Sequence, residues 1–197
     1  MTVIINYKNT KHSSTSGNLV FFVDEKFNIS GLKKYISNSE FLYISDLLKD
    51  SDLKKDLLVF EINSKKTIFL ASIKKDIQAS NIENLGAKFH GYMNYDKKKD
   101  YIINTDTISS KVRNFVGYFL HGIKLKSYEF NIYKSKKDKK LAIINVIGNK
   151  NKISSQDQLR FTALEEGTFF ARDLVSEPGN ILHPDEYAKR INSLKKF

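Results

Sequence analysis

Residues 163–188 read ALEEGTFFARDLVSEPGNILHPDEYA, and this stretch divides the chain into two parts. Apolar side chains recur at helical spacing up to its middle, which predicts one helix over residues 156–175. The string Ser176-Glu177-Pro178-Gly179-Asn180 interrupts that pattern, because proline lacks a backbone donor and glycine tolerates unusual φ angles. Pro184 suits the first turn of a second helix, which we expect to run to the last residue.

Upstream of this stretch, β-rich runs alternate with runs of helical spacing. Strands are predicted over residues 2–6, 18–23, 57–62, 67–72, 101–104 and 141–147, with a polar loop over 9–17 and a hairpin around 63–66. Helical patterns are predicted over residues 29–49 (as one or two helices), 76–93 and 112–123, the last with Ser109 and Ser110 as caps. The alternation predicts an α/β layered domain that ends near Gly148.

Residues 149–152 have the composition of a linker. We therefore predict two units: an N-terminal α/β domain over residues 1–150, and a segment over 151–197 that holds an interdomain helix, a turn and the first helix of a second domain. The two helices of this segment have no sheet of their own to pack against, so we expect their apolar faces to be partly exposed in this chain.

The composition excludes several classes of protein. The chain has 197 residues, a mass of 22.7 kDa and no cysteine, which excludes disulfide scaffolds, thiolate zinc sites and cysteine nucleophiles. The first residues lack the basic start of a signal peptide, and the apolar runs are far shorter than a membrane span of roughly 20 residues. These features suit a cytoplasmic protein.

The net charge of +11 leaves two interpretations open. A basic surface can bind nucleic acid, and the alternating aromatic residues of 128–134, which lie beside the lysine run 134–140, could stack on bases if they form a strand. Only four of the 33 basic residues are arginine, the side chain that grips phosphates best, so the alternative is an ordinary solvated lysine surface.

No catalytic motif is found. The histidines His12, His90, His121 and His183 lack the i, i+4 spacing of a helical zinc site. Adjacent carboxylates, as in Asp24-Glu25, Glu165-Glu166 and Asp185-Glu186, point in different directions on a helix or strand. Glycine patterns typical of serine hydrolases, P-loops and dinucleotide sites are missing. We therefore predict no catalytic, metal or substrate-binding residue in this chain.

Residues 163–188 resemble the interdomain segment of the leucyl (cytosol) aminopeptidase family, where a helix ending in Ala-Arg-Asp-Leu-Val precedes a Pro-containing turn and a new helix. Residues 119–130 (FLHGIKLKSYEF) resemble the Gly-x-x-Leu-x-Ser-Tyr-x-Phe stretch of the same family. The chain departs from the family pattern at Gly179, where a second proline is usual, and at His183, where threonine is usual.

This resemblance implies a three-layer, macro-domain-like fold with a mixed sheet flanked by helices. In the family, the domain with this fold takes no part in catalysis. It implies that a separate catalytic domain with two divalent metals, zinc or manganese, removes N-terminal amino acids from peptides, and that the subunits assemble as a hexamer. The metal-binding motifs of the family are absent here. Asn104-Thr105-Asp106 matches three letters of one of them and continues differently, so we take it as a chance tripeptide.

The resemblance also implies an interdomain hinge. Its residues are Arg172, Asp173, Pro178, Gly179, Asn180 and Pro184. Arginine and aspartate near a helix end can satisfy charge and capping demands, while Pro178 and Gly179 stop the helix. The partners expected for this segment are the catalytic domain and other subunits. The alternative function, from the charge alone, is a basic nucleic-acid-binding module.

Overall fold

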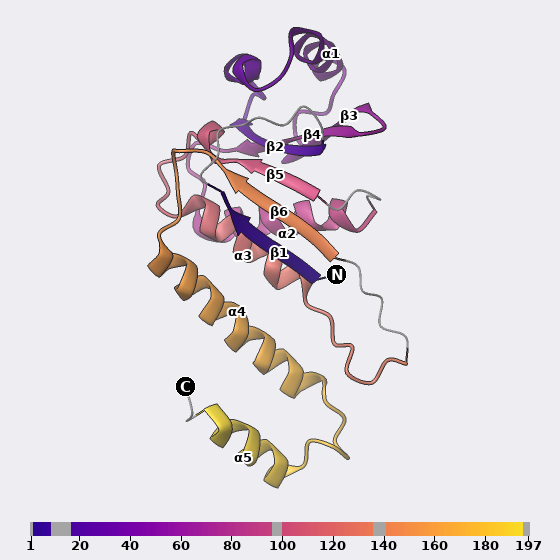
Figure 1. The fold of residues 1–197 in the computed structure, drawn as a ribbon, viewed down its shortest axis with the longest axis vertical. Coiled ribbons are helices and arrows are strands. Elements are labelled where there is room, and N and C mark those ends of the chain that lie inside the picture. Colours follow the sequence, from indigo (N-terminus) through magenta and orange to yellow (C-terminus); the bar gives the residue numbers. More distant parts are fainter. Residues whose placement is uncertain (1, 9–16, 96–99, 136–140, 195–197) are drawn as a thin grey trace.

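A computed structural model describes residues 2–8, 17–95, 100–135 and 141–194. Its centre is a six-stranded sheet in the order β1-β6-β5-β2-β4-β3 (Figure 1). The strands are β1 (Thr2–Tyr7), β2 (Gly17–Asp24), β3 (Leu57–Asn63), β4 (Lys66–Ile73), β5 (Asp100–Asn104) and β6 (Leu141–Ile147). The helices are α1 (Asn38–Lys49), α2 (Ala79–Tyr95), α3 (Phe115–Ser127), α4 (Ser155–Ser176) and α5 (Pro184–Ser193), with short 3₁₀ turns at Ser30–Lys34 and Thr105–Thr107.

The sheet is mixed, as predicted. β1, β6, β5, β2 and β4 pair in parallel, and β3 pairs antiparallel with β4 through the predicted hairpin. The sheet and the helices on both of its faces confirm the α/β fold class. None of the helices in the described residues is long and apolar enough to cross a membrane.

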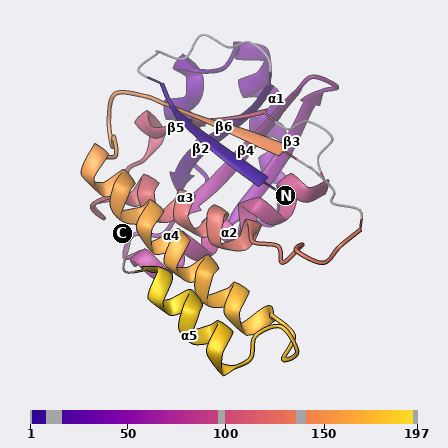
Figure 2. The same cartoon turned by 60° about the horizontal axis from the view of Figure 1, so that its bottom comes forward.

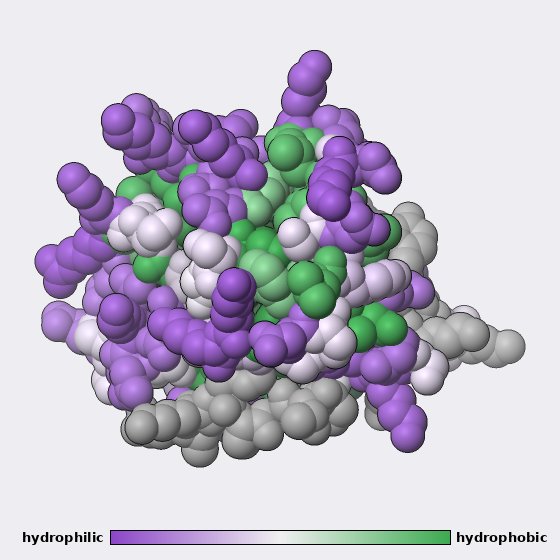
Figure 3. Space-filling view, turned by 90° about the horizontal axis from the view of Figure 1, so that it is seen from above, coloured by the Kyte–Doolittle hydropathy of each residue, from purple (hydrophilic) through white to green (hydrophobic). Residues whose placement is uncertain are grey.

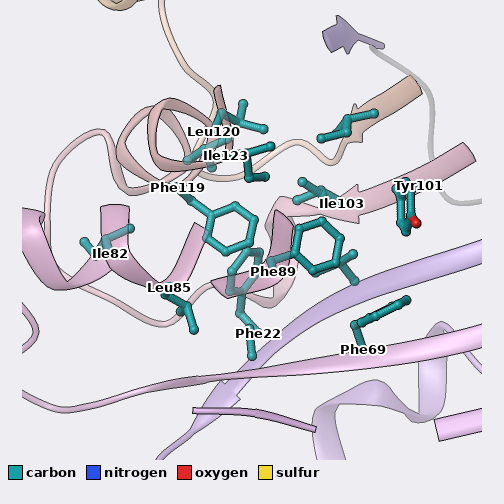
Figure 4. Packing of buried hydrophobic residues seen from close by; sticks show 14 of the residues in the cluster. Phe22, Phe69, Ile82, Leu85, Phe89, Tyr101, Ile103, Phe119, Leu120 and Ile123 are labelled. Atoms are coloured by element: carbon teal, nitrogen blue, oxygen red, sulfur yellow. The ribbon is translucent and has the colours of Figure 1, made fainter. Parts of the chain in front are cut away.

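One face of the sheet carries the larger core. Rings from β2, β4, β5, α2 and α3 meet edge to face: Phe69 and Phe89 have centroids 5.2 Å apart, and Phe22 lies 5.1 Å from Phe119 (Figure 4). The two helices approach each other closely at a glycine of each. A Cβ on Gly122 would lie 1.9 Å from the Glu83 carbonyl oxygen, so this contact requires glycine. The close approach lets α2 and α3 cover the sheet as one layer.

The opposite face is covered by α1 and the 3₁₀ turn before it, over a second core that includes Leu19, Phe21 and Ile68. A capping box at Ser37 and Glu40 begins α1. The same Glu40 carboxylate lies 2.6 Å from the buried Lys66 ammonium, which ties α1 to the start of β4. On the surface above this layer, apolar side chains lie among projecting hydrophilic ones (Figure 3), and Leu42 of α1 is 67% exposed.

Several predicted boundaries are wrong in detail. α2 begins at Ala79 instead of 76, and α3 begins at Phe115 instead of 112. Ser110 does not cap α3; its hydroxyl accepts a hydrogen bond from the Val112 N–H in the turn before the helix. The helix follows Asn114, whose left-handed φ of 59° is a conformation that asparagine tolerates well.

Other predicted features lie partly outside the described residues. These are residues 9–16 of the predicted loop, His12 within it, residues 136–140 of the lysine run, and the last three residues of the second C-terminal helix.

Candidate functional site

The candidate site is the segment formed by α4, the turn after it and α5, because it contains every residue singled out for the hinge. Figures 1 and 2 show α4 leaving the sheet and running beside α3, with α5 folded back beneath it. Ser154 caps α4: its hydroxyl accepts from the Asp157 N–H at 3.0 Å and donates to the Asp157 carboxylate at 2.7 Å. The cap fixes where the connecting helix begins.

The first half of α4 is anchored by one aromatic side chain. Phe161 is the buried residue of α4. Its ring meets the Tyr118 ring edge to face at 5.3 Å and lies 5.4 Å from the His121 ring. A Cβ on Gly117 would come within 2.2 Å of the Phe161 ring, so α3 presents a notch that Phe161 fills.

The second half of α4 is held by Tyr128, the residue after α3. Its hydroxyl donates to Asp173 at 2.7 Å, and its ring lies under the Arg172 guanidinium at 5.4 Å. Arg172 also donates to the Leu125 carbonyl at 2.6 Å, one of the last carbonyls of α3. Burial and the bond to Asp173 both raise the pKa of Tyr128, which therefore remains a neutral donor.

The turn between the helices is organised by Glu177. Its side chain is 2% exposed, lies 2.9 Å from Arg190 of α5, and accepts a hydrogen bond from the Tyr133 hydroxyl. Hydrogen bonds from Tyr133 and Arg190 lower the pKa of the Glu177 carboxyl. Arg190 also pairs with Glu186 one turn back, so α5 is fastened to the end of α4 by charge.

The predicted hinge residues fall into two groups. Arg172 and Asp173 lie inside α4 and connect it to the end of α3, while Pro184 begins α5. Pro178 lies in the turn, where its carbonyl accepts from the N–H groups of residues 181 and 182. Gly179 has no positive φ, so the reason given for that glycine is wrong. Asn180 is exposed beside it.

The sequence-based interpretation missed four residues that hold this segment: Tyr128, Tyr133, Glu177 and Arg190. It assigned residues 128–134 to a possible base-stacking strand, and the structure contradicts that assignment. The segment is irregular, and its tyrosine hydroxyls bind the carboxylates of Asp173 and Glu177. The signal that could have located Tyr128 is its place in the stretch that resembles the aminopeptidase family.

Much apolar surface of the segment is exposed. Among the described residues, α5 has no buried one. Seven apolar side chains of this segment are more than a third exposed: Leu159 (72%), Leu164 (47%), Val175 (86%), Ile181 (38%), Tyr187 (47%), Ile191 (40%) and Leu194 (46%). Exposed apolar side chains in this number suit a segment that packs against another body.

Several of the remaining candidate groups make structural contacts. In the described parts of the chain, no cluster of three His, Asp or Glu residues could hold a metal. His121 bonds Glu83 at 2.8 Å, and His90 is buried within α2. Asp106 accepts from the N–H groups of Asn149 and Lys150, which explains residues 104–106 as a turn. Asp185 and Glu186 lie in the first turn of α5, where their negative charge interacts favourably with the positive end of the helix dipole.

No protein-family model matches this chain. Its sequence is 36% identical to a probable cytosol aminopeptidase of a Bradyrhizobium species over 85 residues, which make up 39% of this chain and 16% of that protein. A probable cytosol aminopeptidase of Clostridium perfringens is 26% identical over 95% of this chain and 40% of its own length. The chain thus spans less than half the length of the curated relatives it matches.

Solved structures agree with these relatives. A mutant of tomato leucine aminopeptidase superposes with a TM-score of 0.72 at 19% identity, over 98% of this chain and 42% of its own. The bottromycin maturation enzyme BotP, solved in complex with Mn, has a TM-score of 0.64 at 14% identity, over 91% of this chain and 36% of its own. The chain is therefore a relative of the cytosol aminopeptidases and has the fold of part of a leucine aminopeptidase, as expected for an N-terminal portion.

Proposed function

We propose that this chain is the N-terminal, non-catalytic portion of a leucyl-aminopeptidase-like metallopeptidase. Residues 1–150 form its α/β domain. Residues 151–197 join that domain to a catalytic domain, with Arg172, Asp173, Pro178, Gly179, Asn180 and Pro184 at the junction. The observation that carries this proposal is the apolar surface of α4 and α5, which lies at the end of a match covering only two fifths of a relative's length.

The full-length protein would remove N-terminal amino acids from peptides in the cytoplasm, as a homo-oligomer that the resemblance makes a hexamer. Two divalent metals, zinc or manganese, would polarise the scissile carbonyl and activate a water there. The residues of this chain do not fit those ions, because the described ones offer no three-ligand cluster and the family's lysine- and carboxylate-bearing motifs are missing from the sequence. We therefore assign this chain the tasks of assembly and of shaping access to the active site.

A peptidase assay tests the non-catalytic assignment. The purified chain, incubated with leucine para-nitroanilide and zinc or manganese, should release no para-nitroaniline above the background of metal alone. The full-length Clostridium perfringens relative is the positive control. Metal-dependent turnover by this chain, lost on chelation, would overturn the assignment.

The junction is tested separately in a longer protein that carries a catalytic domain. Val175→Asp places a charge on the most exposed apolar side chain of α4, and Thr162→Asp places one on the same helix outside the exposed apolar set. We expect the first variant to weaken assembly in sedimentation experiments and the second to leave it unchanged. Equal behaviour of the two would refute docking through this face.

A further inference from the structure

The sheet has two free edges of different character. β3 carries the exposed charge of Glu61 in its second half and a register irregularity between residues 61 and 63. Charges and irregularities of this kind prevent an edge strand from pairing with another chain. β1 has the sequence TVIINY, with no charge and no proline, and its Ile4 is 44% exposed. Of the two edges, β1 is the one suited to accept a strand.

The hydrogen-bonding direction of β1 follows from the ladder it forms with β6. The Lys8 N–H donates to the Val146 carbonyl at 2.9 Å, so the backbone groups of the even-numbered residues face β6. Those of Val3, Ile5 and Tyr7 face away from the sheet. Consistent with this, the Lys124 ammonium donates to the Val3 carbonyl at 3.0 Å. The outward groups of Ile5 and Tyr7 bond to nothing else in the described residues.

A groove of about 350 Å³ runs beside this edge, and α4 forms its other wall. Figure 1 shows β1 at the margin of the sheet, on the side where α4 lies. Gln158, Thr162 and Glu165 of α4 line the groove opposite Ile5 and Tyr7. The space is therefore bounded by an open backbone edge on one side and by α4 on the other, and the apolar side chains of Leu120, Ile153 and Phe161 line it together with Lys124.

Glu165 supplies the charge that selects an occupant. Its carboxylate makes no hydrogen bond or ion pair with another described residue. Burial raises its pKa, and the Lys124 ammonium, which lines the same groove, offsets this only in part. Burial and the proximity of Glu165 also raise the pKa of Tyr7 to about 12, so both groups belong to one partly desolvated region. A cationic side chain beside Glu165 would relieve the cost of burying that carboxylate.

We propose that β1 accepts an additional β-strand: an extended peptide of apolar and basic residues that bonds the outward groups of Ile5 and Tyr7 and places a basic side chain on Glu165. Backbone pairing supplies the affinity and the groove selects alternate side chains, as in other cases of strand addition. A second copy of this chain is a poorer occupant, because its own open edge strand, TVIINY, has no basic side chain to place on Glu165. The inference does not depend on the peptidase assignment.

A labelled peptide of alternating valine and lysine tests the proposal by fluorescence anisotropy. It should bind this chain, although the net charge of the protein opposes it. The same peptide N-methylated along one edge should not bind, because it cannot pair with a strand. A valine–glutamate peptide should bind about tenfold more weakly, or about 1.4 kcal/mol. Equal binding of all three peptides would refute strand addition.

Variants separate the two contacts. Ile5→Pro removes an N–H that faces outward and leaves the β1–β6 ladder intact, and we expect it to weaken peptide binding about tenfold. Glu165→Gln should weaken the lysine peptide by a few-fold, whereas the matched change Glu61→Gln on the opposite edge should have no effect. If Glu61→Gln weakened peptide binding as much as Glu165→Gln does, the peptide would not bind beside Glu165.

Hydrogen exchange of the unmodified chain tests strand addition at β1 even if the Ile5→Pro variant fails to fold. Saturating peptide should slow exchange of the Ile5 and Tyr7 amides and leave the β3 amides unchanged. Unchanged exchange at Ile5 and Tyr7 would overturn the proposal. Protection without peptide that grows with protein concentration would also overturn it, by assigning the edge to a second copy.

Discussion

The domain of residues 1–150 and the segment of residues 151–197 differ in both burial and charge. The first packs large aromatic side chains into the two cores on either side of its sheet, whereas α4 buries Phe161 and α5 has no buried residue among those described. The domain contains 26 basic and 15 acidic residues, and the segment contains seven of each. The whole net charge therefore belongs to the domain, and the segment presents a neutral, partly apolar surface.

This difference indicates where stability is generated. The buried members of both hydrophobic cores all precede residue 148, so we expect residues 1–150 to supply most of the stability. The segment is held by two aromatic contacts, Phe161 on Tyr118 and Phe169 on Tyr128. Hydrogen bonds from Tyr128, Tyr133 and Arg190 add to them. Such contacts orient two helices without burying them, which suits a connection to a further body.

The largest expected effect comes from breaking the domain core. Phe89→Ala removes a fully buried ring that packs on Phe69, Tyr101 and Phe119, and should lower the free energy of unfolding by about 3–5 kcal/mol. Val175→Ala, at a side chain that is 86% exposed, should change it by less than about 0.5 kcal/mol. Urea denaturation followed by circular dichroism measures both. Similar losses in the two variants would mean that α4 belongs to the same cooperative core.

A smaller and local effect is expected at the α4 anchor. Phe161→Ala empties the notch over Gly117 and should destabilise the docked state of α4 by about 2 kcal/mol, because the variant loses one buried ring. Hydrogen exchange should show faster exchange along α4 and little change in the sheet. Leu159→Ala, at an exposed position of the same helix, is the control. Equally faster exchange in the sheet would contradict an independent segment.

The strands, the hairpin and the two C-terminal helices were predictable because each depends on local periodicity. β4 is buried throughout, and α4 begins at Ser155, one residue from the predicted start. The start of α3 was not predictable, since Val112 continues the helical spacing while the backbone is still in the turn that ends at Asn114. The spacing of apolar side chains carries no information about the positive φ angle of Asn114, which makes α3 begin later.

The junction could be predicted only in part for a related reason. Arg172 and Asp173 were singled out because they match the helix ending of the family that the segment resembles. Their partner Tyr128 lies more than 40 residues earlier, and Glu177 meets Tyr133 over a similar separation. Nothing in either stretch alone shows that α3 and α4 lie side by side. The aromatic alternation of residues 128–134 is real, and its function is to supply hydroxyls to α4 and the turn.

Acid should weaken the attachment of α5 to the end of α4. The pKa of Glu177 is lowered in the folded chain, so its contribution to the turn is present above the ordinary glutamate pKa of about 4.3 and is lost as pH falls through the lower folded value. The protection factors of the α5 amides, which correct for the slower intrinsic exchange in acid, should therefore fall at acidic pH while those of β4 stay high. Glu177→Gln should show fast α5 exchange at neutral pH already. If this variant and the parent behave alike, the Arg190 pair does not hold α5.

The smallest expected effect concerns nucleic acid, the alternative suggested by the charge. The strand that would have stacked bases is not formed, so the +11 charge of the domain is what remains to support binding. We expect anisotropy with labelled single-stranded DNA to show weak binding in dilute buffer and little at about 0.15 M salt, because scattered lysines release few counterions together. Binding that persists at that salt concentration and depends on sequence would reveal a true site. Because residues 151–197 carry no net charge, such a site would have to lie on the domain, and α4 and α5 would remain free to dock.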